Sequence, residues 1–162
     1  MLEYLEARPL PVRIIERLED EGGPLSGRYD PRTRTIQIAV QRGGGLSKKL
    51  TSKNWGDVER VSDVAPSLAV ALQKTLAHEL SHDLLWRWAE QLGGFTEVEA
   101  RVRPVFKAGQ PASMRAKFSW REYFCEAHVA YIYHGPVLKQ LDPLGYGIVE
   151  EVRRALELKP LW

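Results

Sequence analysis

The stretch "TLAHELSHDLLW", residues 75–86, is the most informative part of this chain. It places His78 and His82 four residues apart, with Glu79 directly after the first histidine. Each residue of an α-helix turns by about 100°, so the second imidazole lies about 40° round from the first and one turn along. Both rings can then reach one metal ion. Glu79 lies about 100° from His78, where a carboxylate is better placed as a base acting on metal-bound water than as a third ligand.

A long helix is predicted around this motif. Ser67 is a good N-cap, and Gly93-Gly94 ends the pattern after about 25 residues. Large apolar side chains recur at every fourth position, namely Leu72, Leu76, Leu80, Leu84 and Trp88. The helix should run through the centre of the fold and face its histidines into a cleft. The competing interpretation is an amphipathic helix that carries two histidines by coincidence.

The order of the other predicted elements indicates an α+β protein. Residues 12–18 are β-prone, and an Asp30-Pro31 turn leads into the alternating residues Thr35–Val40, which predicts a hairpin. Residues 41–66 are interpreted as a long loop. Beyond the central helix, residues 96–105 alternate polar with apolar and predict a strand or extended arm, with Pro104 favouring a sheet edge. Two further helices are expected over residues 119–133, closed by Gly135-Pro136, and 144–158, with Ile148, Val152 and Leu156 buried.

Length and composition favour one globular domain over residues 1–162. The chain is 44% hydrophobic and 27% charged, which is the ordinary range for a folded domain. The net charge of +2 is spread along the chain and does not indicate a nucleic-acid partner. Cys125 is the single cysteine, so no internal disulfide is possible, and no long apolar run predicts a signal peptide or a membrane span. A cytoplasmic location is expected, with secretion by another route left open.

A hydrolytic zinc site needs a third protein ligand. The extended metzincin motif is excluded, because Leu85 and Trp88 stand where it requires glycine and histidine. The stretch "WREYFCEAH", residues 120–128, offers Glu122 and Glu126 on one helical face among apolar neighbours. Glu122 is the predicted ligand, and Glu126 would accept the free N–H of a zinc-bound histidine. The alternative is a solvated acidic pair. His128, about 200° round from Glu126, should point away.

The two motifs together resemble the gluzincin clan of zinc metallopeptidases, in particular the anthrax lethal factor-like peptidases. HELSH and EYFCEA are separated by 122 − 82 = 40 residues, a spacing similar to that group's, and the resemblance covers about residues 65–150. It implies a zincin-like fold and one catalytic Zn²⁺ held by His78, His82 and Glu122, with Glu79 as general base. Those peptidases carry a stabilising tyrosine seven residues before the glutamate ligand. Here that position is Arg115, whose cation could serve an oxyanion.

The sequence therefore predicts a zinc-dependent endopeptidase whose small N-terminal sheet packs on the central helix. A peptide or protein substrate is expected to pair with an exposed edge such as Thr35–Val40, which makes Ile36 and Ile38 candidate contacts. Trp86, about 80° from His78, either lines a substrate pocket or belongs to the core.

Two other classes of function stay open. One is a catalytically silent zincin-like module that binds a protein partner. The other is a nucleic-acid-associated accessory domain of a mobile element, with Lys48, Lys49, Lys53 and Arg13 contacting phosphates. No oligomeric state is predicted.

Overall fold

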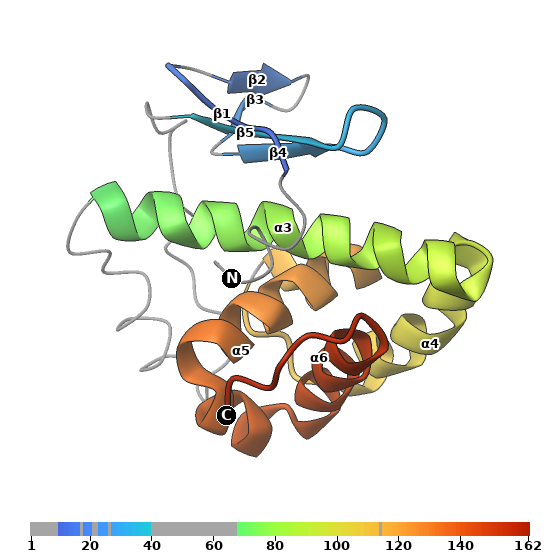
Figure 1. Ribbon diagram of the computed structural model, residues 1–162. Helices are drawn as coiled ribbons and strands as arrows, with labels where there is room; N and C mark the ends of the chain where they lie inside the picture. Colours follow the sequence, from blue (N-terminus) through green and yellow to red (C-terminus); the bar gives the residue numbers. More distant parts are fainter. Residues whose placement is uncertain (1–9, 17, 21–22, 26, 40–67, 114) are drawn as a thin grey trace.

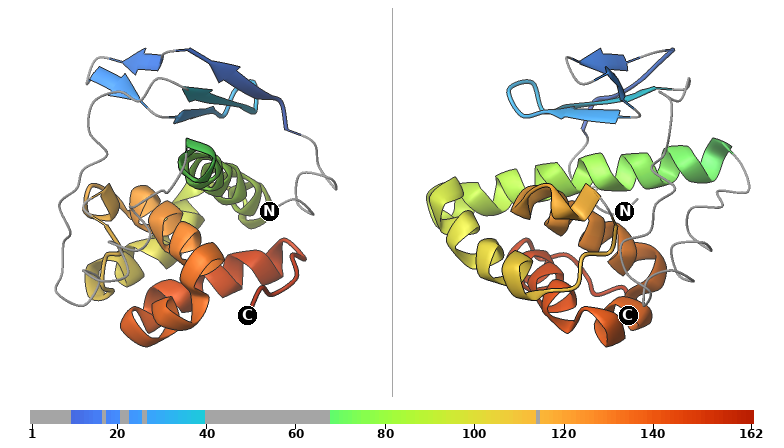
Figure 2. Two further views of the ribbon diagram at one scale, coloured as in Figure 1. Left: turned by 90° about the vertical axis from the view of Figure 1, so that its left-hand side faces the viewer. Right: turned by 180° about the vertical axis from the view of Figure 1, so that it is seen from behind.

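The protein has a mixed α+β fold, as the sequence predicts (Figure 1). The computed structural model describes residues 10–16, 18–20, 23–25, 27–39, 68–113 and 115–162. The strands lie on one side of the long helix α3 (Leu68–Leu92), and the remaining helices lie on its other side (Figures 1 and 2). The predicted loop over residues 41–66 and the proposed cap Ser67 lie outside the described residues.

Strand β5 (Thr35–Ala39) is the middle strand of a three-stranded sheet. It pairs in parallel with β1 (Val12–Ile15) and antiparallel with β4 (Gly27–Asp30), which confirms the predicted hairpin. Asp30 stabilises the turn, because its carboxylate accepts the Arg32 N–H and the Thr33 hydroxyl, both at 2.9 Å. A second, two-stranded antiparallel sheet contains β2 (Leu18–Asp20) and β3 (Gly23–Leu25).

The prediction that Thr35–Val40 forms an exposed edge is wrong. Strand β5 has hydrogen-bonded neighbours on both sides, so its backbone has no free edge for a substrate. Ile36 and Ile38 are buried, with exposed fractions of 0% and 4%, and they belong to the core. The alternation of apolar with polar residues correctly predicts that these side chains are buried, but it does not distinguish a central strand from an edge strand. These side chains are therefore unavailable to a substrate.

Helix α3 has the predicted length and position. It ends where the two glycines enter left-handed backbone conformations, with φ of 88° at Gly93 and 144° at Gly94. The Gly94 N–H closes the last turn on the Ala89 carbonyl at 2.8 Å. Leu84 and Trp88 are buried, as the leucine stripe predicts, but Ser81 and Asp83 are buried as well. The helix is covered on several faces because it lies between the sheet and the other helices (Figure 2).

The predicted strand over residues 96–105 is wrong, because this segment is helix α4 (Phe95–Ala108). Val98 and Val102 are fully buried at a spacing of four, so the face that packs follows the helical repeat. The same two valines also fit a period of two, and the sequence alone does not separate these interpretations. Pro104 lies inside the helix and not at a sheet edge.

The two C-terminal helices are present, but both end at other residues than predicted. Helix α5 (Trp120–Leu141) starts at the cap Ser119, whose hydroxyl accepts the Glu122 N–H at 3.2 Å. It bends at His134, where φ is −146° and ψ is 41°, and continues instead of ending at Gly135-Pro136. Helix α6 (Pro143–Ala155) buries Ile148 and Val152, as predicted, but it ends before Leu156, which is only partly buried.

Among the described residues, no helix is both long enough and apolar enough to cross a membrane.

Candidate metal centre

His78, His82 and Glu122 come together between helices α3 and α5. The Nε2 atom of His78 lies 3.3 Å from Oε2 of Glu122, and the Nε2 atom of His82 lies 3.5 Å from Oε1 of the same carboxylate. The helical spacing within each motif and the packing of α3 on α5 place all three groups at one point. The structure thus brings together the three residues that the sequence proposes as a ligand set.

The Nε2 atom of His78 is buried and makes no hydrogen bond among the described residues. It faces Glu122, but its alignment is too poor for a hydrogen bond. The other ring nitrogen, Nδ1, donates to Oε1 of Glu126 at 2.7 Å. Glu126 therefore fixes the orientation of the ring and directs Nε2 toward Glu122. A buried ring nitrogen that makes no hydrogen bond destabilises the fold, and a bound cation would recover that free energy.

The charges of the metal-free centre are strongly coupled. Burial alone would lower the pKa of His78, but its contacts with Glu122 and Glu126 raise that pKa to about 9. Burial alone would raise the pKa of Glu122, but His78, His82 and Arg115 hold it far below its usual range. Without a metal, His78 is therefore protonated at neutral pH and Glu122 is ionised. A cation that binds here must displace the proton from His78.

Arg115 contacts the proposed ligand Glu122. It lies in the 3₁₀ turn η1 (Arg115–Lys117), and its Nε donates to Oε2 of Glu122 at 2.5 Å. Burial opposes the charge of Arg115, but the attraction of Glu122, and more weakly of Glu79 and Glu126, raises its pKa. Its side chain remains 45% exposed. This arginine is therefore at the centre, but it is paired with Glu122.

Glu79 is almost completely buried, with 2% of its surface exposed, and strand β4 packs directly against it. A Cβ atom at Gly27 would lie 3.0 Å from Cγ of Glu79 and 2.6 Å from Cγ2 of Thr75. Position 27 therefore has to be glycine for β4 to approach the helix this closely. The sequence analysis did not identify Gly27, because nothing in its local pattern marks the contact.

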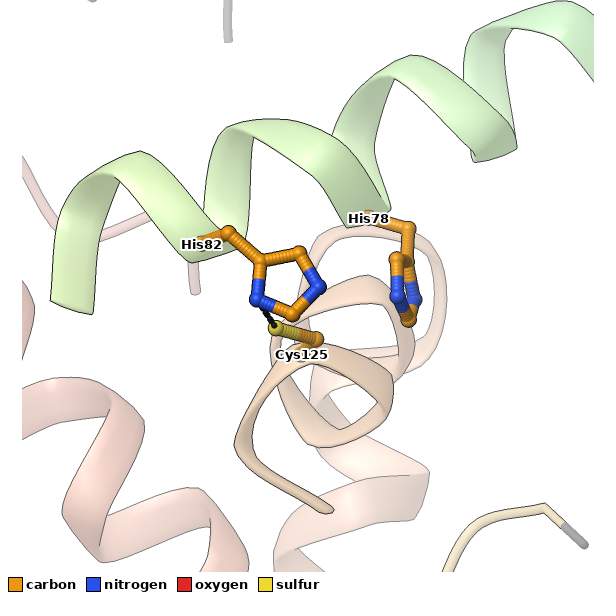
Figure 3. A group of neighbouring side chains, drawn as sticks. All are labelled: His78, His82 and Cys125. Carbon is orange, nitrogen blue, oxygen red and sulfur yellow. Dashed lines mark hydrogen bonds between the residues drawn. The ribbon is translucent and has the colours of Figure 1, made fainter. Parts of the chain in front are cut away.

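Cys125 contacts Nδ1 of His82, the ring nitrogen that does not face Glu122. Its Sγ lies 3.4 Å from Nδ1 of His82, and the two side chains point toward one another across the α3 and α5 interface (Figure 3). The thiol is fully buried, and burial, followed by the nearby carboxylates, raises its pKa well above the ordinary value. His78, His82 and Cys125 each offer one donor atom, and these three atoms lie within 4.8 Å of one another.

The two possible donor sets share the histidines but differ in the third group. Glu122 faces the Nε2 edge of His82, whereas Cys125 faces its Nδ1 edge. The carboxylate of Glu122 is ionised and contacts both Nε2 atoms, so it is available as an oxygen donor for a cation. The thiol is protonated in its buried position and serves there as the hydrogen-bond partner that orients His82.

Trp86 is neither fully buried nor fully exposed, at 38%. It packs edge-to-face on Phe95 with ring centroids 4.6 Å apart, and the Arg121 guanidinium lies 4.9 Å from the centre of the Phe95 ring. This position, one helical turn beyond His82, leaves part of the indole accessible beside the centre.

His128 points away from the centre, as its helical phase predicts. The Ser81 hydroxyl donates to the Ala77 carbonyl at 2.7 Å, so Nδ1–H of His128 must donate to Ser81 Oγ, also at 2.7 Å. Nε2 of His128 then accepts from Nη1 of Arg153 at 3.4 Å. His128 is thus a neutral core histidine that joins three helices.

Comparison with known proteins identifies no relative: no family model matches the chain, and no curated protein or solved structure is similar to it. The function must therefore be argued from the geometry around His78 and from the chemistry of its neighbours.

Proposed function

We propose that the protein is a zinc-dependent endopeptidase with a zincin-like fold, in which His78, His82 and Glu122 hold one catalytic ion. The observation that carries this proposal is the buried Nε2 atom of His78, which has no hydrogen-bond partner among the described residues and faces a carboxylate that also faces His82. Two imidazoles and one carboxylate form a donor set that catalytic zinc sites use, and such sites leave a fourth position open.

Each of the residues around the proposed ion would have a separate role in hydrolysis. When bound, zinc supplies the Lewis acidity that makes water a nucleophile at neutral pH. Glu79, held against β4, would take a proton from the attacking water and pass it to the leaving amine. Glu126 keeps Nδ1 of His78 protonated, which leaves Nε2 free to act as a ligand.

Arg115 would compensate negative charge in the same reaction. Its present partner, Glu122, would share part of its charge with a bound cation, and the weakened ion pair would leave the guanidinium able to face the developing oxyanion. Arg115→Gln should then lower kcat by about a hundredfold or more, as expected for an oxyanion donor, with the zinc content retained. An unchanged kcat would assign Arg115 to charge balance alone.

The substrate would bind along β4 and not along β5. Strand β4 is an edge among the described strands, and it packs against Glu79 through Gly27. An extended peptide can add to such an edge through its backbone. The partly exposed Trp86 is the proposed contact for a substrate side chain.

Metal analysis and proteolysis test the proposal separately. The purified parent should contain about one zinc per chain, as a single catalytic site requires. His78→Ala and Glu122→Ala should both lose it. Glu79→Gln should keep zinc and lose cleavage of a peptide library, whereas Glu151→Gln, at an exposed ion pair with Arg101, should change neither. Normal zinc in Glu122→Ala would refute the ligand set, and normal cleavage by zinc-loaded Glu79→Gln would refute the base.

A second candidate is a silent zinc-binding module with a protein partner. The position of the site favours this candidate, since an ion there would join α3 to α5 whether or not hydrolysis occurs. Arg115 also stands where the lethal factor-like peptidases, which the two motifs resemble, carry their stabilising tyrosine. A zinc-loaded parent that cleaves no peptide would establish this alternative. For the nucleic-acid alternative, Lys48, Lys49 and Lys53 lie outside the described residues, and Arg13 is exposed on β1.

A further inference from the structure

The His82 ring is approached by a different donor on each edge. Its Nε2 lies 3.5 Å from Oε1 of Glu122. Its Nδ1 lies 3.4 Å from Sγ of Cys125 (Figure 3). An imidazole can bind a metal through either nitrogen, and the neighbour of each nitrogen decides which one does so. One edge of this ring therefore meets an oxygen donor and the other meets a sulfur donor.

We propose that Cys125, His82 and His78 form a second metal position that takes soft, thiophilic cations such as Cd²⁺. This position cannot be filled while zinc occupies the position beside Glu122. This inference rests on the proposed zinc position for the exclusion, but the sulfur site itself does not depend on it. The three donor atoms lie within 4.8 Å of one another, close enough to surround one ion. Thiolate ligands favour soft ions, and Cd²⁺ is softer than zinc, whereas a carboxylate such as that of Glu122 gives no such preference.

His78 is the reason that only one position can be filled at a time. Its Nδ1 is engaged with Glu126 at 2.7 Å, so only Nε2 is free to bind a metal. That Nε2 is buried and makes no hydrogen bond among the described residues, so the observation that supports the zinc position supports a cation in the sulfur position as well. One nitrogen cannot serve two ions, and the sulfur position and the Glu122 position must compete.

The binding step releases one proton. The S–H bond of Cys125 breaks as the sulfur–metal bond forms, and the proton goes to solvent. The side chain of His82 is 20% exposed and offers a route from the otherwise buried thiol to water. Because the sulfur position draws the ion away from Glu122, a soft cation would displace zinc and stop hydrolysis.

Cadmium titration of the metal-free protein tests the inference. Cd²⁺ should produce the ultraviolet thiolate-to-cadmium charge-transfer absorption, and ¹¹³Cd NMR of the unmutated protein should report a sulfur ligand. Cys125→Ser, which replaces the sulfur with a hydroxyl that can still contact Nδ1 of His82, should abolish the absorption but still bind zinc. Excess zinc should remove the absorption by competition for His78 and His82.

The Glu122→Ala variant separates this inference from the proposed function. It should bind zinc more weakly than the parent but keep the cadmium absorption, because Glu122 is not a ligand in the sulfur position. If the parent binds cadmium without sulfur absorption and without a sulfur-type NMR shift, the second position does not exist. If zinc and cadmium bind together to one chain, or if Cys125→Ser loses zinc as completely as His82→Ala, the two positions are not alternatives. If Glu122→Ala keeps its zinc while the cadmium absorption is present, the zinc assignment fails and the sulfur site stands.

Discussion

The hydroxyl of Tyr29 donates a 2.7 Å hydrogen bond to the buried carboxylate of Asp83, which joins strand β4 to helix α3 directly after His82. Burial, and then this bond, raise the pKa of Tyr29, so the phenol stays protonated as the donor. Arg34 reaches the same carboxylate oxygen at 3.1 Å, and Arg87 reaches the other at 2.7 Å. Asp83 therefore fixes the sheet against the helix that carries the candidate centre.

Replacing Asp83 should destabilise the fold strongly. Asp83→Ala leaves the cations of Arg34 and Arg87 without their buried carboxylate, and breaking a buried pair in this way costs about 3–5 kcal/mol. Tyr29→Phe removes one hydrogen bond and should cost about 1 kcal/mol. Urea unfolding of the metal-free proteins measures both free energies.

Gln37→Ala is the matched control for this network. It removes the 2.9 Å bond that Arg28 donates to Gln37 on the exposed side of the same hairpin, and it should change the free energy of unfolding by less than about 0.5 kcal/mol. Equal effects in Asp83→Ala and Gln37→Ala would show that Asp83 does not hold the sheet in place.

Gly27→Ala should impair turnover more than folding. The added Cβ would lie 2.6 Å from Cγ2 of Thr75 and 3.0 Å from Cγ of Glu79, so both side chains must shift. Overpacking of this kind costs about 1–3 kcal/mol. A displacement of the base by about 1 Å costs on the order of a hundredfold in turnover. Peptide hydrolysis and zinc content would be measured together, and zinc should be retained.

Gly147→Ala provides the comparison, since a Cβ there meets nothing within 4 Å and the position lies inside α6. This substitution should stabilise the protein by about 0.5–1 kcal/mol through helix propensity and leave turnover unchanged. If Gly27→Ala cleaves peptides at the parent rate, the close contact of β4 with Glu79 has no catalytic consequence.

Glu126→Ala should weaken zinc binding without removing a ligand. Nδ1 of His78 would lose its 2.7 Å acceptor, and loss of such a partner reduces metal affinity by about 10–100-fold. Competition with a chromophoric chelator measures the zinc affinity. Glu126→Gln keeps a carbonyl acceptor, so its zinc affinity should lie between that of Glu126→Ala and that of the parent. A zinc affinity unchanged in Glu126→Ala would mean that Glu126 does not orient His78 for binding.

His128 should make the protein less stable in acid. Burial, and then the charge of Arg153, lower the pKa of His128 from 6.5 to about 3. Between these values the unfolded chain holds a proton that the folded chain does not. The contribution of neutral His128 is therefore fully present above pH 6.5 and is lost as the pH falls toward 3, by up to about 1.4 kcal/mol per pH unit.

Urea unfolding of the parent and His128→Gln at pH 7 and pH 5 would measure this difference, with a chelator present in every sample. His78, whose pKa is raised, also changes its contribution between pH 7 and pH 5, but it is present in both proteins and therefore cancels in the difference between them. Parallel pH profiles for the two proteins would contradict the assignment of His128 as a neutral core group.

The local patterns of the sequence were enough to predict the main features of the centre. The spacing of four places His78 beside His82 and Glu122 beside Glu126, because each pair lies on one helix whose geometry is fixed by its own backbone. The turn at Asp30 likewise predicts the hairpin, and Gly93 predicts the end of the long helix. These features depend on residues close together in the chain.

Other features depend on residues far apart, and only the tertiary structure decided them. The spacing of the apolar residues Val98 and Val102 fits both a strand and a helix. Burial of one face of the segment selects the helix. The pairing of β1 with β5 places β5 in the middle of the sheet and leaves β4 at an edge among the described strands.

The contacts that surround the motif are of the same long-range kind. Cys125 meets His82 across 43 residues, and Tyr29 meets Asp83 across 54. The sequence by itself determined which residues could form the centre, since helix periodicity is a local property. Tertiary packing decided what surrounds each of them, because contacts between distant segments are set by the burial of whole faces and not by spacing along the chain.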